Sequence, residues 1–198
     1  GGIGKTKRKG RCQRVVENRL HGNTGNCKAC TGNKGVCGKK ADTAEIQDKL
    51  TGSLIGLARA TEGNEHVVSD STAAVIVEGL FATLTNVNFD NNALLNILGK
   101  VEIEKQKLVP DCFHCAAPCG RNNDYDMSKL WNADEDIRSL KSLILFGIRG
   151  VAAYAYHAAM LGYKDESIHR FLYKECLLKS PMQHLSSSCL HALHKQLT

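Results

Sequence analysis

Three cysteines near the start of the chain have the types and spacing of metal ligands. Cys27, Cys30 and Cys37 are separated by two and six residues, in a segment rich in glycine and lysine. Glycine permits the tight turns that aim several thiolates at one centre. Lysine charge favours thiolates and offsets the negative charge of an iron–sulfur cluster. We therefore predict a metal centre here, surrounded by four lysines: Lys28, Lys34, Lys39 and Lys40.

A closed tetrahedral or cubane site needs a fourth ligand. Cys12 is the nearest further cysteine, and His21 is the alternative. The predicted metal ligands are therefore Cys12, Cys27, Cys30 and Cys37. The plainer alternative is a set of free thiols in a glycine-rich loop. Zinc would satisfy four thiolates as well as iron would.

A second group of cysteines lies in mid-chain, at Cys112, Cys115 and Cys119, with a histidine before the second of them. Chance clustering and a redox pair are two interpretations of this group. A second metal site is a third interpretation. A fourth is a shared site in which Cys112 and Cys115 join Cys27 and Cys30. Clusters with two-residue spacers favour metal ligation over disulfides, which indicates a reducing compartment.

The remaining candidate residues have ordinary structural interpretations. Cys176 and Cys189 lie in helical surroundings and are expected to be buried, inert thiols. His157 lies in an apolar segment, where a packed, hydrogen-bonded histidine is expected rather than a metal ligand. The sequence shows no Ser/His/Asp set, Walker loop or paired-carboxylate arrangement.

Positive charge is concentrated in residues 1–20, which contain seven lysines and arginines against one glutamate. This segment accounts for the whole formal charge of +6, so the rest of the chain sums to zero. A solvated tail or a trimmed targeting sequence is one interpretation. Contact with RNA phosphates or another acidic surface is the other, and it would recognise charge rather than base sequence. The basic residues nearest the start are Lys5, Lys7, Arg8, Lys9 and Arg11.

Beyond residue 40 the apolar residues recur at helical spacing. A first helix is expected from Asp42 or Thr43, with the stripe Ile46, Leu50, Leu54 and Leu57. Four further helices are expected over 73–84, 91–108, 134–161 and 165–178, and 185–197 adds a short one. Their predicted N-caps are Ser69-Asp70-Ser71 for the second helix, Asp134 for the fourth and Asp165 for the fifth.

The helical pattern restarts after a linker, as an internal repeat would. At an offset of 94 residues Gly56 aligns with Gly150 and Leu54 with Ile148. Glycine inside a helix costs about 1 kcal/mol relative to alanine, so close helix–helix approach is expected at both glycines. Charged residues and glycines interrupt the apolar stretch 140–161, which predicts a buried amphipathic helix rather than a membrane span.

The predicted fold is all-α, with two consecutive three-helix bundles. The expected organisation is a basic tail (1–20), a cysteine-rich metal-binding loop (21–40), a first bundle (41–109), a cysteine-containing linker (110–132) and a second bundle (133–198).

Four stretches of this sequence resemble the N-terminal helical domain of the hybrid-cluster protein (prismane, hydroxylamine reductase) family. They are Cys30-Thr-Gly-Asn-Lys-Gly-Val-Cys-Gly-Lys39, Ile46-Gln-Asp-Lys-Leu50, Leu80-Phe-Ala-Thr-Leu-Thr-Asn-Val-Asn-Phe-Asp90, and Gly147 to Tyr163. The resemblance covers about residues 27–176. It implies two three-helix bundles, in agreement with the repeat.

The resemblance also implies a proximal iron–sulfur cluster, with [4Fe-4S] favoured, held by four cysteines. Cys30 and Cys37 match the third and fourth of these ligands. The family's first two ligands form a Cys-x2-Cys pair upstream, where this chain has only Cys12. Cys27 is therefore expected to replace one member of that pair.

In the family the catalytic hybrid cluster is bound by later domains, which this chain is not expected to include, so no catalysis by this chain alone is expected. The favoured hypothesis is an accessory subunit of an organellar ribonucleoprotein, such as a ribosome, or of a respiratory complex. Its location would be the mitochondrial matrix, with the cytoplasm and the plastid as alternatives. The other hypothesis is an electron-relay module, or a fragment, of a hydroxylamine or nitric oxide reductase.

Overall fold

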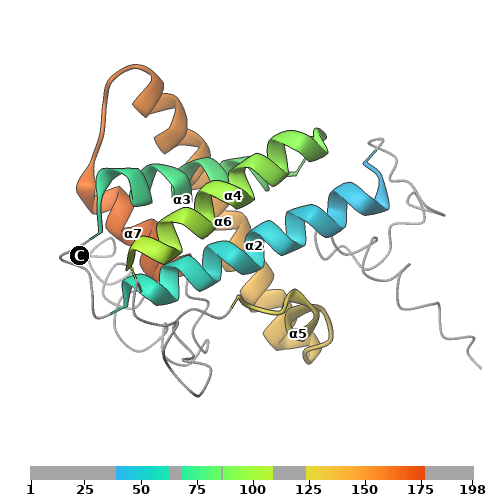
Figure 1. Ribbon diagram of the computed structural model, residues 1–198. Helices are drawn as coiled ribbons and strands as arrows, with labels where there is room; N and C mark the ends of the chain where they lie inside the picture. Colours follow the sequence, from blue (N-terminus) through green and yellow to red (C-terminus); the bar gives the residue numbers. More distant parts are fainter. Residues whose placement is uncertain (1–38, 63–67, 86, 109–123, 177–198) are drawn as a thin grey trace, which may run out of the picture.

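A computed structural model describes residues 39–62, 68–85, 87–108 and 124–176 (Figure 1). These ranges contain helices and no β-strand, which confirms the all-α prediction for the part of the chain that is described. The helices are α2 (Ala41–Thr61), α3 (Asp70–Ala82), α4 (Asn91–Leu108), α5 (Met127–Trp131), α6 (Glu135–Met160) and α7 (Glu166–Cys176).

Side chains that accept hydrogen bonds from backbone N–H groups set the starts of three of the five longer helices. Ser69 Oγ accepts from the N–H of Thr72 at 3.2 Å at the start of α3, as predicted. Asp165 Oδ1 accepts from the N–H of Ser167 at 2.8 Å at the start of α7, also as predicted. Asp90 plays the same part before α4, accepting from the N–H of Asn92 at 2.8 Å.

The other two long helices begin differently from their predicted caps. Helix α2 begins at Ala41, before the predicted Asp42 or Thr43, and its N-cap residue Lys40 makes no side-chain hydrogen bond. Asp134 does stand at the N-cap of α6, but its carboxylate makes no capping hydrogen bond. Helix formation at these two places therefore depends more on packing than on the cap.

A short helix, α5, lies in the segment predicted to be a linker. It is set against α2 by two contacts: Trp131 Nε1 donates to Asp48 Oδ2 at 2.6 Å, and the N–H of Tyr125 donates to the carbonyl of Gly52 at 3.0 Å. The chain passes so close to α2 that a Cβ at position 52 would overlap the Tyr125 carbonyl oxygen. Glycine is therefore required at the crossing.

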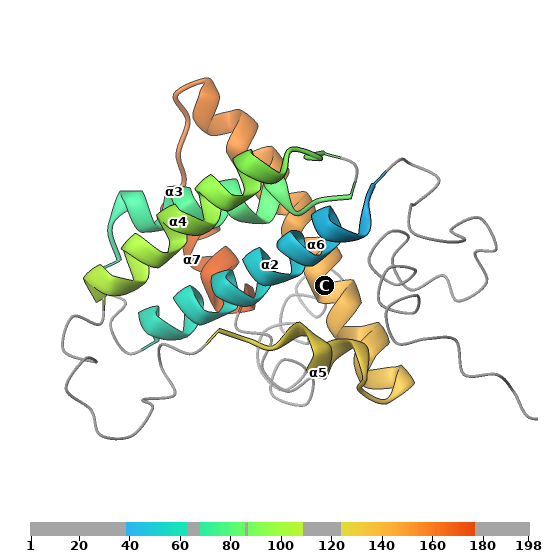
Figure 2. The same ribbon diagram turned by 45° about the vertical axis from the view of Figure 1, so that its right-hand side comes forward.

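Helix α2 forms the centre of the core, with fifteen of its 21 residues buried. It lies beside α4 in both views and also packs against α3, α5 and α7 (Figures 1 and 2). Helix α3 in turn packs against α4, α6 and α7. The described helices therefore share one hydrophobic core, and the division into two bundles with its domain boundaries stays a prediction. Core residues of α2 that are fully covered include Leu50, Leu54, Ile55 and Leu57.

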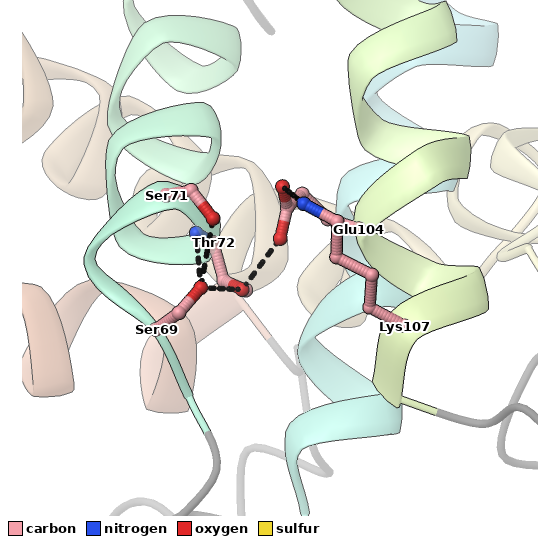
Figure 3. Close-up of polar contacts among 5 residues, drawn as sticks. All are labelled: Ser69, Ser71, Thr72, Glu104 and Lys107. Atoms are coloured by element: carbon pink, nitrogen blue, oxygen red, sulfur yellow. Dashed lines mark hydrogen bonds and ion pairs between the residues drawn. The ribbon is translucent and has the colours of Figure 1, made fainter.

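A buried carboxylate joins α3 to α4 (Figure 3). Glu104 on α4 accepts a hydrogen bond from Thr72 Oγ1 at 2.8 Å and one from Lys107 Nζ at 2.7 Å. Thr72 also hydrogen-bonds to Ser69, the N-cap of α3. The polar cluster therefore stabilises the start of α3 and its packing against α4 together.

Helix α6 is much less buried than predicted. Only four of its 26 residues are buried: Ser142, Leu145, Ile148 and Ala152. Ile137, Leu140 and Leu143, which share its apolar pattern, are exposed. Among the described residues no neighbour lies within 4 Å of a Cβ built at Gly150, so the close approach predicted there is not found. By length and composition α6 would be able to cross a membrane, although α3, α5 and α7 pack against it.

Candidate metal centre and its surroundings

The predicted metal ligands lie outside the described residues. This holds for Cys12, Cys27, Cys30 and Cys37, for the mid-chain group of Cys112, Cys115 and Cys119, and for Cys189. Within the described ranges no group of three or more His, Cys, Asp or Glu side chains is arranged to hold a metal ion. The described residues begin at Lys39, directly after the segment that contains Cys27, Cys30 and Cys37.

Lys39 follows Cys37 by two residues and is 1% exposed. Its Nζ donates to Gln47 Oε1 at 2.9 Å and lies 5.7 Å from the centroid of the Phe89 ring. Gln47 Nε2 donates to the backbone carbonyl of Asn88 at 2.9 Å. The stretch that ends at Lys39 and the stretch that contains Asn88 and Phe89 therefore meet, although 48 residues lie between Lys39 and Asn88 in the sequence.

The start of α2 is tied to the start of α4 by a second polar contact. Thr43 Oγ1 donates to Asn91 Oδ1 at 2.8 Å, and Asn91 Nδ2 donates to Asp42 Oδ2 at 3.1 Å. The pKa of Asp42 lies below its usual range, because its carboxylate accepts hydrogen bonds from the backbone N–H of Thr43 and from the Asn91 side chain. These contacts fix the point at which the chain leaves the predicted metal-binding loop.

The buried cation suits an anionic metal centre. A positive charge held in a covered position acts more strongly on nearby groups than one in water, and it favours thiolates over thiols. Lys39 has this position, whereas Lys40 is exposed. Of the four lysines predicted to surround the centre, Lys39 is thus the one that the structure shows turned inward within the described part of the chain.

Cys176, the cysteine that the structure does describe, is fully buried. Burial raises the pKa of its thiol to about 12, against the opposing effect of the nearby Arg149 guanidinium. A thiol that stays protonated is a poor ligand and a poor nucleophile. The prediction of a buried, inert thiol is confirmed for Cys176.

Arg149 lies between α6 and the helices that it packs against. Its Nε donates to Thr83 Oγ1 at 3.0 Å and its Nη2 to Thr51 Oγ1 at 2.9 Å. Burial lowers the pKa of the guanidinium, while the negative charge of Asp48 acts in the opposite direction. The two threonine hydroxyls hold the guanidinium in place by accepting its hydrogen bonds. Arg149 therefore joins α6 to α2 and to the end of α3. This contact was not predictable from the sequence, because neither Thr51 nor Thr83 belongs to a chemical motif.

His157 is packed by aromatic rings but is more exposed than predicted. Its ring stands edge-on to Phe81 at 5.3 Å and to Tyr156 at 6.0 Å between centroids. A pocket of about 270 Å³ lies beside these rings, between α3, α4 and α6, with the Lys100–Glu78 ion pair at 2.9 Å on its wall. The pocket is also lined by Asn88, whose carbonyl accepts from Gln47, the residue that holds Lys39.

Comparison with known proteins gives a consistent result. A family model described as the Prismane/CO dehydrogenase family matches residues 11–194. Curated proteins named "Hydroxylamine reductase" are similar: one from Thermoanaerobacter pseudethanolicus is 37% identical over 163 residues, which is 71% of this chain and 29% of that protein.

Two further relatives with the same name extend this result. The one from Methanocella arvoryzae is 40% identical over 162 residues, covering 70% of this chain and 30% of that protein. The one from Clostridium perfringens is 36% identical over 190 residues, covering 86% and 34%. The chain thus spans about a third of the length of the curated relatives that it matches.

Proposed function

The chain belongs to the Prismane/CO dehydrogenase family, and on this basis we propose that it forms the iron–sulfur-binding helical part of a hydroxylamine reductase. In this role it passes electrons to a catalytic part of the enzyme. The observation that carries the proposal is the similarity to proteins of that name over a continuous third of their length. The cysteine cluster and the buried Lys39 supply the chemistry that such a part requires.

Cys30 and Cys37 are the firmest proposed ligands, with Cys27 and Cys12 completing a set of four thiolates. Such a set holds an iron–sulfur cluster, which supplies one-electron transfer when bound. Cys112, Cys115 and Cys119 are proposed as a second or shared site. Thiolate ligands require a reducing compartment to stay available.

The described residues support this centre by position and charge. Lys39 is covered and follows Cys37 by two residues, and we propose that its positive charge favours the thiolate form of that cysteine. Gln47 holds the Lys39 ammonium by a hydrogen bond and is itself held by the carbonyl of Asn88. The α3–α4 connection thereby orients the chain that leads out of the loop.

We expect purified protein, prepared under anaerobic conditions, to contain iron and acid-labile sulfide and to show the broad visible absorption of an iron–sulfur cluster. Cys37→Ser should lose most of both, because it removes a ligand. Cys176→Ser is the matched control, since its thiol is buried and protonated, and this variant should retain the wild-type iron content. Iron and sulfide analysis of the three proteins tests the proposal.

Two outcomes would contradict the proposal. Zinc without sulfide would indicate a structural zinc site rather than an electron-transfer centre. Equal loss of iron in Cys37→Ser and Cys176→Ser would show that the loss follows unfolding and not the removal of a ligand. The accessory-subunit hypothesis rests on the basic residues 1–20, which lie outside the described residues, so we place it second.

A further inference from the structure

Helix α6 is apolar on two opposite sides. One side contains the buried Leu145, Ile148 and Ala152. The other, which we call the outer face, follows the spacing 3-4-3-4-7 along the helix, so its residues lie in one stripe about half a turn from the buried side. The outer face consists of Leu140, Leu143, Gly147, Gly150 and Tyr154 on α6, and it continues to Leu161, the residue directly after the end of the helix.

The large side chains of the outer face are strongly exposed. Leu143 is 69% exposed, Tyr154 82% and Leu161 77%. Single exposed apolar residues are ordinary on protein surfaces, but a continuous apolar patch marks an interaction site. A helix that is apolar all round is normally buried on all sides. The outer face therefore has the composition of a core surface.

Two glycines form the middle of the outer face. A Cβ at Gly147 or at Gly150 would have no neighbour within 4 Å in the described structure, so no contact found there requires either glycine. Each costs about 1 kcal/mol relative to alanine inside a helix. Between Leu143 and Tyr154 they leave a notch into which a bulky side chain of another element can be inserted at close range.

The charged side chains within 140–161 are engaged on the other side of α6. Arg149 is bonded to Thr51 and Thr83, and Lys141 Nζ lies 5.8 Å from the centroid of the Tyr125 ring. The outer face itself therefore offers an uncharged surface about 32 Å long, from 21 residue steps of 1.5 Å. This length suits the packing of a whole further domain.

We propose that the outer face packs against the part of a hydroxylamine reductase polypeptide that lies beyond the third matched by this chain. The proposal rests on the proposed function above. It applies equally whether that part continues this polypeptide or is a separate one. About 70% of each relative lies outside the match, which supplies a body large enough to cover the face. A bilayer would contact α6 on all sides, whereas α3, α5 and α7 pack along it and Arg149 is bonded to its neighbours.

The test is a chimera of the Methanocella arvoryzae hydroxylamine reductase in which the matched third is replaced by this chain. We compare Leu143→Glu and Tyr154→Glu with Ile103→Glu, a control that places the same charge on α4, where Ile103 is 55% exposed. A carboxylate buried without a partner is costly. Both outer-face variants should release the helical part to limited proteolysis at least about tenfold faster, and the control should behave as the parent.

The same variants in the isolated 198-residue chain separate docking from folding. There, Leu143→Glu and Tyr154→Glu should leave the circular dichroism spectrum and the thermal midpoint unchanged. Equal proteolysis of all chimeras would overturn the proposal. So would a dimer of the isolated chain that Tyr154→Glu dissociates, or binding of the chain to phosphatidylcholine vesicles that this variant abolishes.

A second measurement keeps the proposal testable if the chimera does not fold. A photo-crosslinking amino acid is placed in the intact Methanocella relative at the position that aligns with Tyr154. The crosslink should map to the polypeptide outside the matched third, and a map confined to the matched third would overturn the proposal. Iron content reports separately on the proposed function, so the two can fail independently.

Discussion

Glu104 is a carboxylate held at a covered position by three donors. Burial alone would raise the pKa of Glu104, but hydrogen bonds from Lys107, Thr72 and Ser71 outweigh it, so its pKa lies below the ordinary value of 4.5. Because the folded state holds the ionised form more strongly than the unfolded state does, Glu104 adds stability above about pH 4.5. That stability is lost as the pH falls through the folded pKa.

We expect Glu104→Gln to lower the free energy of unfolding at pH 7 by about 1–2 kcal/mol, since hydrogen bonds to a charged acceptor are lost. The variant should also show a shallower decline in stability between pH 5 and pH 3 than the parent does, because the titrating group is gone. Urea unfolding at several pH values measures both effects. Glu45→Gln, at an exposed position of α2, is the control and should leave the free energy of unfolding at pH 7 unchanged.

The inward position of Lys39 illustrates what spacing cannot show at the level of a single residue. The sequence predicts that lysines surround the metal centre, and it gives no reason to separate Lys39 from Lys40. The structure distinguishes the two lysines, because Lys39 contacts Gln47 and Phe89 whereas Lys40 is exposed. Gln47 lies on α2, eight residues beyond Lys39, whereas Phe89 comes from a remote segment, so local helix formation and the tertiary fold together select one lysine.

At the level of elements, the crossing of α2 by the segment before α5 depends on one glycine. Gly52→Ala would place a methyl group against the backbone of Tyr125, which has no side-chain rotamer by which to move away. We expect a loss of about 1–3 kcal/mol in the free energy of unfolding, because the crossing chain must shift. The hydrogen bond from the Tyr125 N–H to Gly52 would weaken with it.

Gly99→Ala on α4 is the matched control, because a Cβ there meets nothing within 4 Å. This substitution should stabilise the protein by about 0.5–1 kcal/mol through the higher helix propensity of alanine. Denaturant titration of both variants gives the comparison. A neutral or stabilising Gly52→Ala would contradict a close crossing of α2 by the segment at Tyr125.

The elements that the sequence predicts well are those whose ends are marked by caps and whose apolar residues lie on one side. Helix α4 has the predicted bounds, and α3 and α7 begin at their predicted caps. Helix α5 was missed because five residues are too few to show a period. The buried side of α6 was misjudged because its apolar residues surround the helix, so periodicity does not single out one face.

At the scale of the whole molecule, the shared core makes a prediction about unfolding. Leu54 on α2 and Leu145 on α6 belong to one cluster of buried side chains. Leu54→Ala and Leu145→Ala should each cost about 2–5 kcal/mol and should lower the midpoint of the same cooperative transition. Calorimetry and circular dichroism, followed on each variant, should report a single coincident transition.

Two separable transitions, with Leu145→Ala lowering only one, would contradict a shared core and would support two independent bundles. The sequence repeat favours two bundles, since it shows similarity between 46–58 and 140–152. The repeat does not show how its two copies pack against each other, because this packing depends on which helices α3 packs against. In the described structure α3 meets α4, α6 and α7.

The candidate metal centre itself was predicted from local features alone. The spacing of the cysteines indicated that they are candidate metal ligands. The family resemblance then favoured Cys30 and Cys37 over the other candidates. Long-range contacts such as Gln47 with Asn88 were not predictable, because neither residue belongs to a chemical motif. The assignment of Cys12, Cys27, Cys30 and Cys37 as ligands stays a prediction that metal analysis tests.

The covered thiol of Cys176 gives the molecule an internal reporter. With its pKa raised to about 12 and no exposed surface, this thiol cannot meet an alkylating reagent until α7 separates from its neighbours. Its alkylation rate at neutral pH therefore follows the frequency of that opening. Since Cys176 is not among the cysteines proposed as ligands, its modification can report opening of the helical body while iron analysis reports occupancy of the metal centre.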